Sequence, residues 1–104
     1  VLAVQPKDTI RRSRGGEFFD QTLDRNALWL VQTPQAFRAS VLMKAFKEAK
    51  HDRFYGTDEA GLVERIGVRV RIVEGSYDNI KITTQEDVDL GRLILERWRT
   101  KGLL

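Results

Sequence analysis

The chain has 104 residues and a mass of 12.0 kDa, the size of one small domain, and its 41% of hydrophobic residues is ordinary globular usage. It holds no cysteine and one histidine, which excludes disulfides, thiolate nucleophiles and cysteine or multi-histidine metal sites, and no apolar run is long enough to span a membrane. Its net charge is +3, but the basic residues are not interleaved with stacking aromatics, so we expect neither a nucleic-acid nor a membrane partner.

The first residues have the character of a buried strand. Leu2–Val4 is apolar, and Pro6, which lacks a backbone donor, ends the segment. A domain usually begins with loose, polar residues, so a start in mid-strand at Val1 indicates a piece of a longer protein. No basic flank with a long apolar stretch is present, so we expect no secretory signal and a cytoplasmic protein.

A β-hairpin is predicted next. Two β-prone segments, Thr9–Ser13 and Phe18–Leu23, flank Arg14–Glu17 with its pair of glycines. Most side chains on both faces are polar, and a two-stranded ribbon is marginally stable alone. We therefore predict an arm at about residues 7–25 that lies on another surface, such as a partner subunit.

The apolar segment Leu28–Val31 predicts a central strand that leads into a helix. Thr33 as the cap and Pro34 in the first helical position predict that the helix begins there, and it should end near His51, which we expect to face solvent. The helix has one apolar stripe, made of Phe37, Val41, Leu42, Ala45, Phe46 and Ala49.

A second, shorter helix is predicted to open at Thr57–Glu59 and to end at Gly67. The alternation in Val68–Val73 predicts a strand, and Asn79–Thr83 is predicted as another. Such an order of elements favours an α/β sheet with helices on its faces.

The last helix is predicted from about residue 85 to residue 101. Thr84 to Asp87 resembles a capping box at its start, with Asp in the acidic position, and Gly102 is expected to follow its end. The side chains available to the core are Val88, Leu90, Ile94, Leu95 and Trp98.

Three residues stand where open α/β sheets bind ligands, beyond the carboxyl ends of strands: Thr33, Thr57 and Lys81. Threonine hydroxyls, helix N-terminal amides and a lysine together make an anion site. Taken singly, each threonine is better explained as a helix cap, and Lys81 is equally explained as an exposed residue of an edge strand. Arg25 is the residue type that binds phosphate in a bidentate manner, although an isolated surface arginine usually has no role. These residues predict an anion-binding edge, and no catalytic set accompanies it.

The chain also resembles the 2-C-methyl-D-erythritol 4-phosphate cytidylyltransferases. The resemblance covers nearly all of the chain, in order and with natural spacing, and corresponds to the C-terminal half of that family. It rests on Lys7–Ile10, Asp24–Asn26 with Leu28 and Trp29, Gln32–Phe37, Thr57–Ala60 with Leu62–Glu64, and Asn79–Thr83 with Glu86 and Asp87.

The resemblance implies a transferase with a Rossmann-like α/β nucleotidyltransferase sheet that works as a homodimer through embracing β-arms. Such enzymes transfer a cytidylyl group from CTP to methylerythritol phosphate and release pyrophosphate, in the non-mevalonate route to isoprenoids, with Mg²⁺. Residues 1–104 would form the C-terminal part of one domain. The nucleotide-binding half, with its metal ligand, would lie upstream of Val1, so we expect no metal ligand here and no turnover of CTP by this chain alone.

The resemblance also implies roles for five residues at the substrate phosphate. Arg25, joined by Thr9, would reach from the arm into the neighbouring subunit's site. Thr33, Thr57 and Lys81 would line the pocket of their own subunit. Arg25 and Lys81 would position the phosphate for in-line attack on the α-phosphorus of CTP.

Two alternatives remain open at this point. A ribitol-5-phosphate cytidylyltransferase shares the Gln32–Gln35 and Asn79–Lys81 elements, although Thr57–Glu64 argues against it. The other alternative is a non-catalytic dimerisation fragment that keeps the arm.

Overall fold

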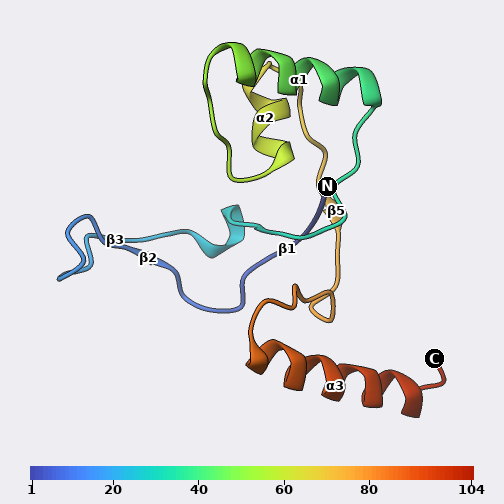
Figure 1. Ribbon diagram of the computed structural model, residues 1–104. Coiled ribbons are helices and arrows are strands. Elements are labelled where there is room, and N and C mark those ends of the chain that lie inside the picture. The colour runs from blue at the N-terminus through green and yellow to red at the C-terminus, as the bar shows by residue number, and fades with distance from the viewer.

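A small mixed sheet lies at the centre of the computed structural model, which describes residues 1–104. Its three strands have the order β4–β1–β5, where β1 is Leu2–Val4, β4 is Leu30–Val31 and β5 is Val73–Glu74. β4 pairs with β1 antiparallel and β5 pairs with β1 parallel. In Figure 1, two helices lie together above this sheet and a third lies below it. The α/β class predicted from the sequence is confirmed.

The main core lies between α1 (Ala39–His51) and α2 (Glu59–Arg65). Ala45 and Ala49 of α1 are buried against Leu62 and Val63 of α2. Alanine at both buried positions of α1 lets the two helix backbones approach closely. His51, the last residue of α1, is exposed as predicted.

The predicted hairpin is present as β2 (Arg11–Arg12) and β3 (Gln21–Thr22), which pair antiparallel. It projects sideways from the rest of the chain in Figure 1. Phe18 and Phe19 near its tip are 77% and 72% exposed, so the arm presents apolar side chains that this chain itself does not cover.

The prediction that the first helix begins at Thr33–Pro34 is wrong. Residues 34–38 are not helical, and α1 begins only at Ala39. The side chain of Gln35 explains the delay, because it bonds to Asp58 and to a backbone N–H at the start of α2. These bonds hold the segment beside α2 instead of in a first helical turn.

Three predicted strands differ from the prediction. Leu28–Val31 is reduced to Leu30–Val31 and lies at an edge of the sheet instead of its centre, and the other two are shortened or absent. Only the end of Val68–Val73 becomes a strand, since β1 begins at Leu2 and pairs with Val73, and no strand lies beside the residues before it. Asn79–Thr83 is not a strand. The N–H groups of Asn79 and Ile80 bond within a turn, to the carbonyls of Ser76 and Asp78, and not to a neighbouring strand.

The last helix, α3 (Gln85–Thr100), has the predicted bounds, and Gly102 follows it with a positive φ of 70°. The prediction of which α3 side chains are buried is only partly correct. Ile94 is buried and Trp98 half-buried, but Leu90 and Leu95 are 47% and 48% exposed because α3 packs against no other helix or strand.

The capping box at the start of α3 is confirmed. The Thr84 hydroxyl accepts from the Asp87 N–H, and Asp87 Oδ2 accepts from the N–H groups of Thr83 and Thr84 at 3.0 and 2.9 Å. These backbone donors, together with the two hydroxyls, lower the pKa of Asp87 from 3.8 to about 2.

The pH dependence of α3 should therefore depend on Asp87. Because the folded pKa is depressed, the ionised carboxylate stabilises the helix start above pH ~4, and this contribution is lost as the pH falls towards ~2. In Asp87→Asn, the protection factors of the amides in the first turn of α3, which correct for the intrinsic pH dependence of exchange, should be lower at pH 6 than in wild type and should change little down to pH 2. Asp89→Asn, a substitution in the next turn, should have the same protection factors as wild type. Protection factors with the same pH dependence in all three proteins would contradict the proposed role of Asp87.

The molecule is open in shape. Its radius of gyration is 17.4 Å, against about 13 Å for a compact domain of this length, and only 9 of 104 residues are buried. Apolar side chains of β4 and α3, among them Leu30, Val31 and Leu93, remain exposed, a kind of surface that other polypeptide usually covers. Judged by length and hydropathy, none of the α-helices qualifies as a membrane span.

Candidate functional site

The two threonines of the predicted anion site are not helix caps. Asp58 caps α2, its Oδ1 accepting from the Gly61 N–H at 2.8 Å, and the cap position of α1 is Arg38 without a side-chain bond. Thr33 and Thr57 are both exposed. The capping alternative is therefore wrong for both, and their hydroxyls are available to a ligand.

Strand direction alone does not bring Thr33 close to Lys81. β4 is antiparallel and β5 parallel to β1, so their carboxyl ends lie at opposite ends of the sheet. The turn after β5 folds back instead, and Asn79 Nδ2 donates to the carbonyl oxygen of Thr33 at 2.7 Å. This bond joins the segment before Lys81 directly to Thr33.

The side chain of Gln32 adds a second link between these segments. Its Nε2 donates to the carbonyl oxygens of Ser76 and Asn79 at 2.7 and 3.2 Å. Its Oε1 accepts from the Ser76 N–H at 3.3 Å. The turn at 76–79 is thus bonded to the end of β4 through a side-chain amide.

Gln35 links Thr33 to the other predicted segment, at the start of α2. Its Nε2 donates to Asp58 Oδ2 at 3.0 Å, and its Oε1 accepts from the Ala60 N–H at 3.1 Å. Thr57 precedes the capping residue Asp58 directly, so the position of Thr57 relative to Thr33 is fixed by this bridge.

Lys81 is exposed and lies between the 76–79 turn and α3. Asp78 anchors the turn to α3, since it pairs with Arg97 and accepts from Trp98 Nε1 at 2.8 Å. The indole N–H, followed by the guanidinium, holds the pKa of Asp78 below its usual value. The carboxylate therefore stays ionised, and the segment carrying Lys81 is held at both ends.

Arg25 and Thr9 lie on the arm. Arg25 begins η1 (Arg25–Ala27), and its Nη1 donates to the carbonyl oxygen of Lys7 at 2.7 Å, which ties the two legs of the arm together. Lys7 Nζ lies 3.9 Å from the ring centroid of Tyr77, whose hydroxyl donates to the carbonyl oxygen of Gln5 at 2.8 Å. The foot of the arm is therefore attached to the same turn that leads to Lys81.

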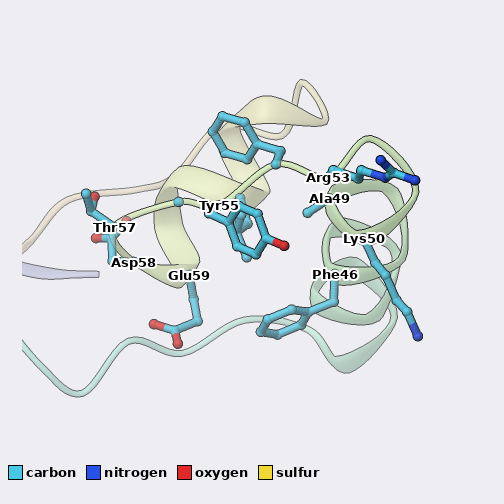
Figure 2. A pocket seen from close by; sticks show the side chains of 11 residues that line it. Phe46, Ala49, Lys50, Arg53, Tyr55, Thr57, Asp58 and Glu59 are labelled. Atoms are coloured by element: carbon cyan, nitrogen blue, oxygen red, sulfur yellow. The ribbon is translucent and has the colours of Figure 1, made fainter.

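A cavity of about 410 Å³ lies between α1 and the start of α2. Figure 2 shows the ring of Tyr55 in it, with Phe46 on one side and Thr57 on the other, while Lys50 and Arg53 point away from Thr57. Neither Thr33 nor Lys81 lines this cavity. Thr57 is the only one of the predicted phosphate ligands that does.

The structure joins the segments of Thr33, Thr57 and Lys81 and leaves Arg25 and Thr9 on the arm. The reasoning from sequence assigned no role to Gln32 or Gln35. Their position in the sequence could have indicated a role, because these two amide side chains lie on either side of the predicted ligand Thr33 in an otherwise apolar stretch.

The described residues do not fit a metal site. No three His, Asp or Glu side chains come together anywhere in the chain.

Comparison with known proteins gives one consistent relationship. The family model described as 2-C-methyl-D-erythritol 4-phosphate cytidylyltransferase matches residues 1–97. The protein of that name from Geobacillus kaustophilus is 55% identical over 95 residues, which cover 91% of this chain and 41% of the relative. The one from Chloroherpeton thalassium is 50% identical over 103 residues, 95% of this chain and 42% of the relative. The chain thus spans less than half the length of these curated relatives.

Solved structures agree with the sequence relatives. The 4-diphosphocytidyl-2C-methyl-D-erythritol synthase of Anaerococcus prevotii superposes with a TM-score of 0.83 at 33% identity, over 92% of this chain and 43% of that one. The 2-C-methyl-D-erythritol 4-phosphate cytidylyltransferase of Thermus thermophilus gives 0.79 at 31% identity, over 91% and 48%. The likeness therefore holds in sequence and in fold.

Proposed function

This chain belongs to the 2-C-methyl-D-erythritol 4-phosphate cytidylyltransferase family, and we propose that it supplies the substrate-phosphate side of such an enzyme. The protein would transfer a cytidylyl group from CTP to methylerythritol phosphate in isoprenoid biosynthesis. The observation that carries the proposal is the bonded network around Thr33, which ties it to the segments of Thr57 and Lys81. Neither threonine serves as a helix cap, which supports a ligand role.

The chemistry of the substrate matches these groups. A phosphate monoester carries nearly two negative charges at neutral pH, so its site needs a cation and hydrogen-bond donors. Lys81 would supply the charge, and the hydroxyls of Thr33 and Thr57 the donors. Held there, a phosphate oxygen attacks the α-phosphorus of CTP; the new P–O bond forms as the bond to the β-phosphate breaks, and pyrophosphate leaves. Such transfer depends chiefly on positioning and on charge neutralisation.

We further propose a homodimer in which the arm completes the neighbouring site. Arg25 would bind the same phosphate from the partner subunit, with Thr9 beside it. Two features support this: the arm projects away from its own body (Figure 1), and its apolar tip residues Phe18 and Phe19 are exposed. Mg²⁺ and CTP enter this proposal through the family, and their ligands would lie in the part of the relatives that this chain does not cover.

Pyrophosphate release tests the proposed function. A protein that carries this chain at the full length of its relatives should release pyrophosphate from CTP with methylerythritol phosphate and should be nearly silent with ribitol 5-phosphate. The 104-residue chain alone should be inactive, because the residues expected to bind CTP are not in it. Activity with ribitol 5-phosphate alone would show that ribitol 5-phosphate is the substrate. Turnover by the 104-residue chain would contradict the proposal that it supplies only the substrate-phosphate side.

A further inference from the structure

Gln32 uses every polar atom of its side chain to hold the turn that leads to Lys81. The two N–H groups face two carbonyl oxygens and Oε1 faces an N–H, so the reversed amide would place its oxygen against both carbonyls. Asn79 returns a bond from the same turn to Thr33. Thr33, Gln32 and the turn therefore form a closed hydrogen-bonded ring, and Gln32 is half-buried within it.

Gly75 gives independent support for this path of the Gln32 side chain to the turn. A Cβ atom at position 75 would collide with Oε1 of Gln32. The glycine therefore leaves the space through which the glutamine side chain passes from β4, across β1, to the turn after β5.

Gln35 likewise uses its side-chain amide to hold a distant segment, here the start of α2. It bonds the second carboxylate oxygen of the cap Asp58, whose first oxygen is taken by Gly61, and it satisfies the N–H of Ala60, one of the donors that a helix start leaves unpaired. These bonds are partly buried and span 23 and 25 residues of sequence, so they serve tertiary placement and not local helix formation.

We propose that Gln32 and Gln35 are positioning residues for the transfer reaction, an inference that rests on the proposed function. From either side of Thr33–Pro34 they fix the two other ligand segments, one with Lys81 and one with Thr57, at set distances from Thr33. The three groups then meet the substrate phosphate without first having to be ordered.

The test uses the full-length protein and the variants Gln32→Leu, Gln35→Leu and Gly75→Ala, with Gln85→Leu at the exposed start of α3 as the matched control. Each of the three should raise the KM for methylerythritol phosphate by about tenfold or more, while the KM for CTP and the melting temperature stay close to wild type. Gln85→Leu should change neither KM. Amide exchange should become faster at Ser76 in Gln32→Leu and at Ala60 in Gln35→Leu.

The outcomes separate this inference from the proposed function. A wild-type protein that releases no pyrophosphate with methylerythritol phosphate contradicts both. An active wild type whose three variants keep their KM for methylerythritol phosphate contradicts the positioning role alone. A parallel rise of both KM values with a lower melting temperature would show a purely structural role and would also overturn it.

Discussion

Replacing Lys81 by alanine in the full-length protein should lower kcat/KM for methylerythritol phosphate by about 10²–10³-fold, the usual cost of removing one preorganised charge or donor from a transferring group. Lys81 is the only cation on the bonded segments around Thr33, and it stands exposed at the end of a turn fixed by Asn79 and Asp78. No other lysine or arginine on these segments is placed to replace it.

Initial rates of pyrophosphate release at varied methylerythritol phosphate measure this effect. Lys47→Ala, which removes an exposed lysine from the outer face of α1, is the matched control and should leave kcat/KM within about twofold. If the two substitutions lower kcat/KM equally, Lys81 does not bind the substrate phosphate.

Heterodimers should show that Lys81 and Arg25 act from different subunits. The single variants Lys81→Ala and Arg25→Ala should each be nearly inactive. A purified heterodimer of the two, made by co-expression with different tags, should recover about half of the wild-type activity per dimer, because one of its two sites then receives both intact residues.

The reverse arrangement supplies the control. A heterodimer of wild type with the double variant Lys81→Ala, Arg25→Ala should be nearly inactive, since each site lacks one of the two residues. If the first heterodimer is inactive and the second half-active, Arg25 serves its own subunit's site and the proposed role of the arm is wrong.

Elements that depend on local chemistry were predictable from the sequence. The capping box of Thr84 and Asp87 joins residues three apart, and the hairpin turns through Gly16, which has a positive φ of 79°. Both are present because the groups that stabilise them lie within the same short segment.

Elements that depend on distant partners were not predictable. Asn79–Thr83 alternates like a strand, but no strand lies beside it, so its backbone bonds form a turn. Thr33 precedes a proline like a helix cap, yet the helix starts later because Gln35 bonds to a residue 23 positions away.

The candidate site also contains residues that were predictable from the sequence and residues that were not. Thr33, Thr57 and Lys81 were identifiable as residue types that bind anions, whereas the glutamines that hold their segments were not. A glutamine in a sequence carries no sign of which distant carbonyl it meets, and here the contacts of Gln32 span 44 and 47 residues.

A crystal structure of the full-length protein with methylerythritol phosphate is the most direct test of the central claim. The account predicts that the phosphate oxygens lie within about 3 Å of Lys81 Nζ and of the hydroxyls of Thr33 and Thr57, with Arg25 of the neighbouring subunit on the same group. A phosphate bound instead in the cavity between α1 and α2, against Lys50 and Arg53, would contradict it.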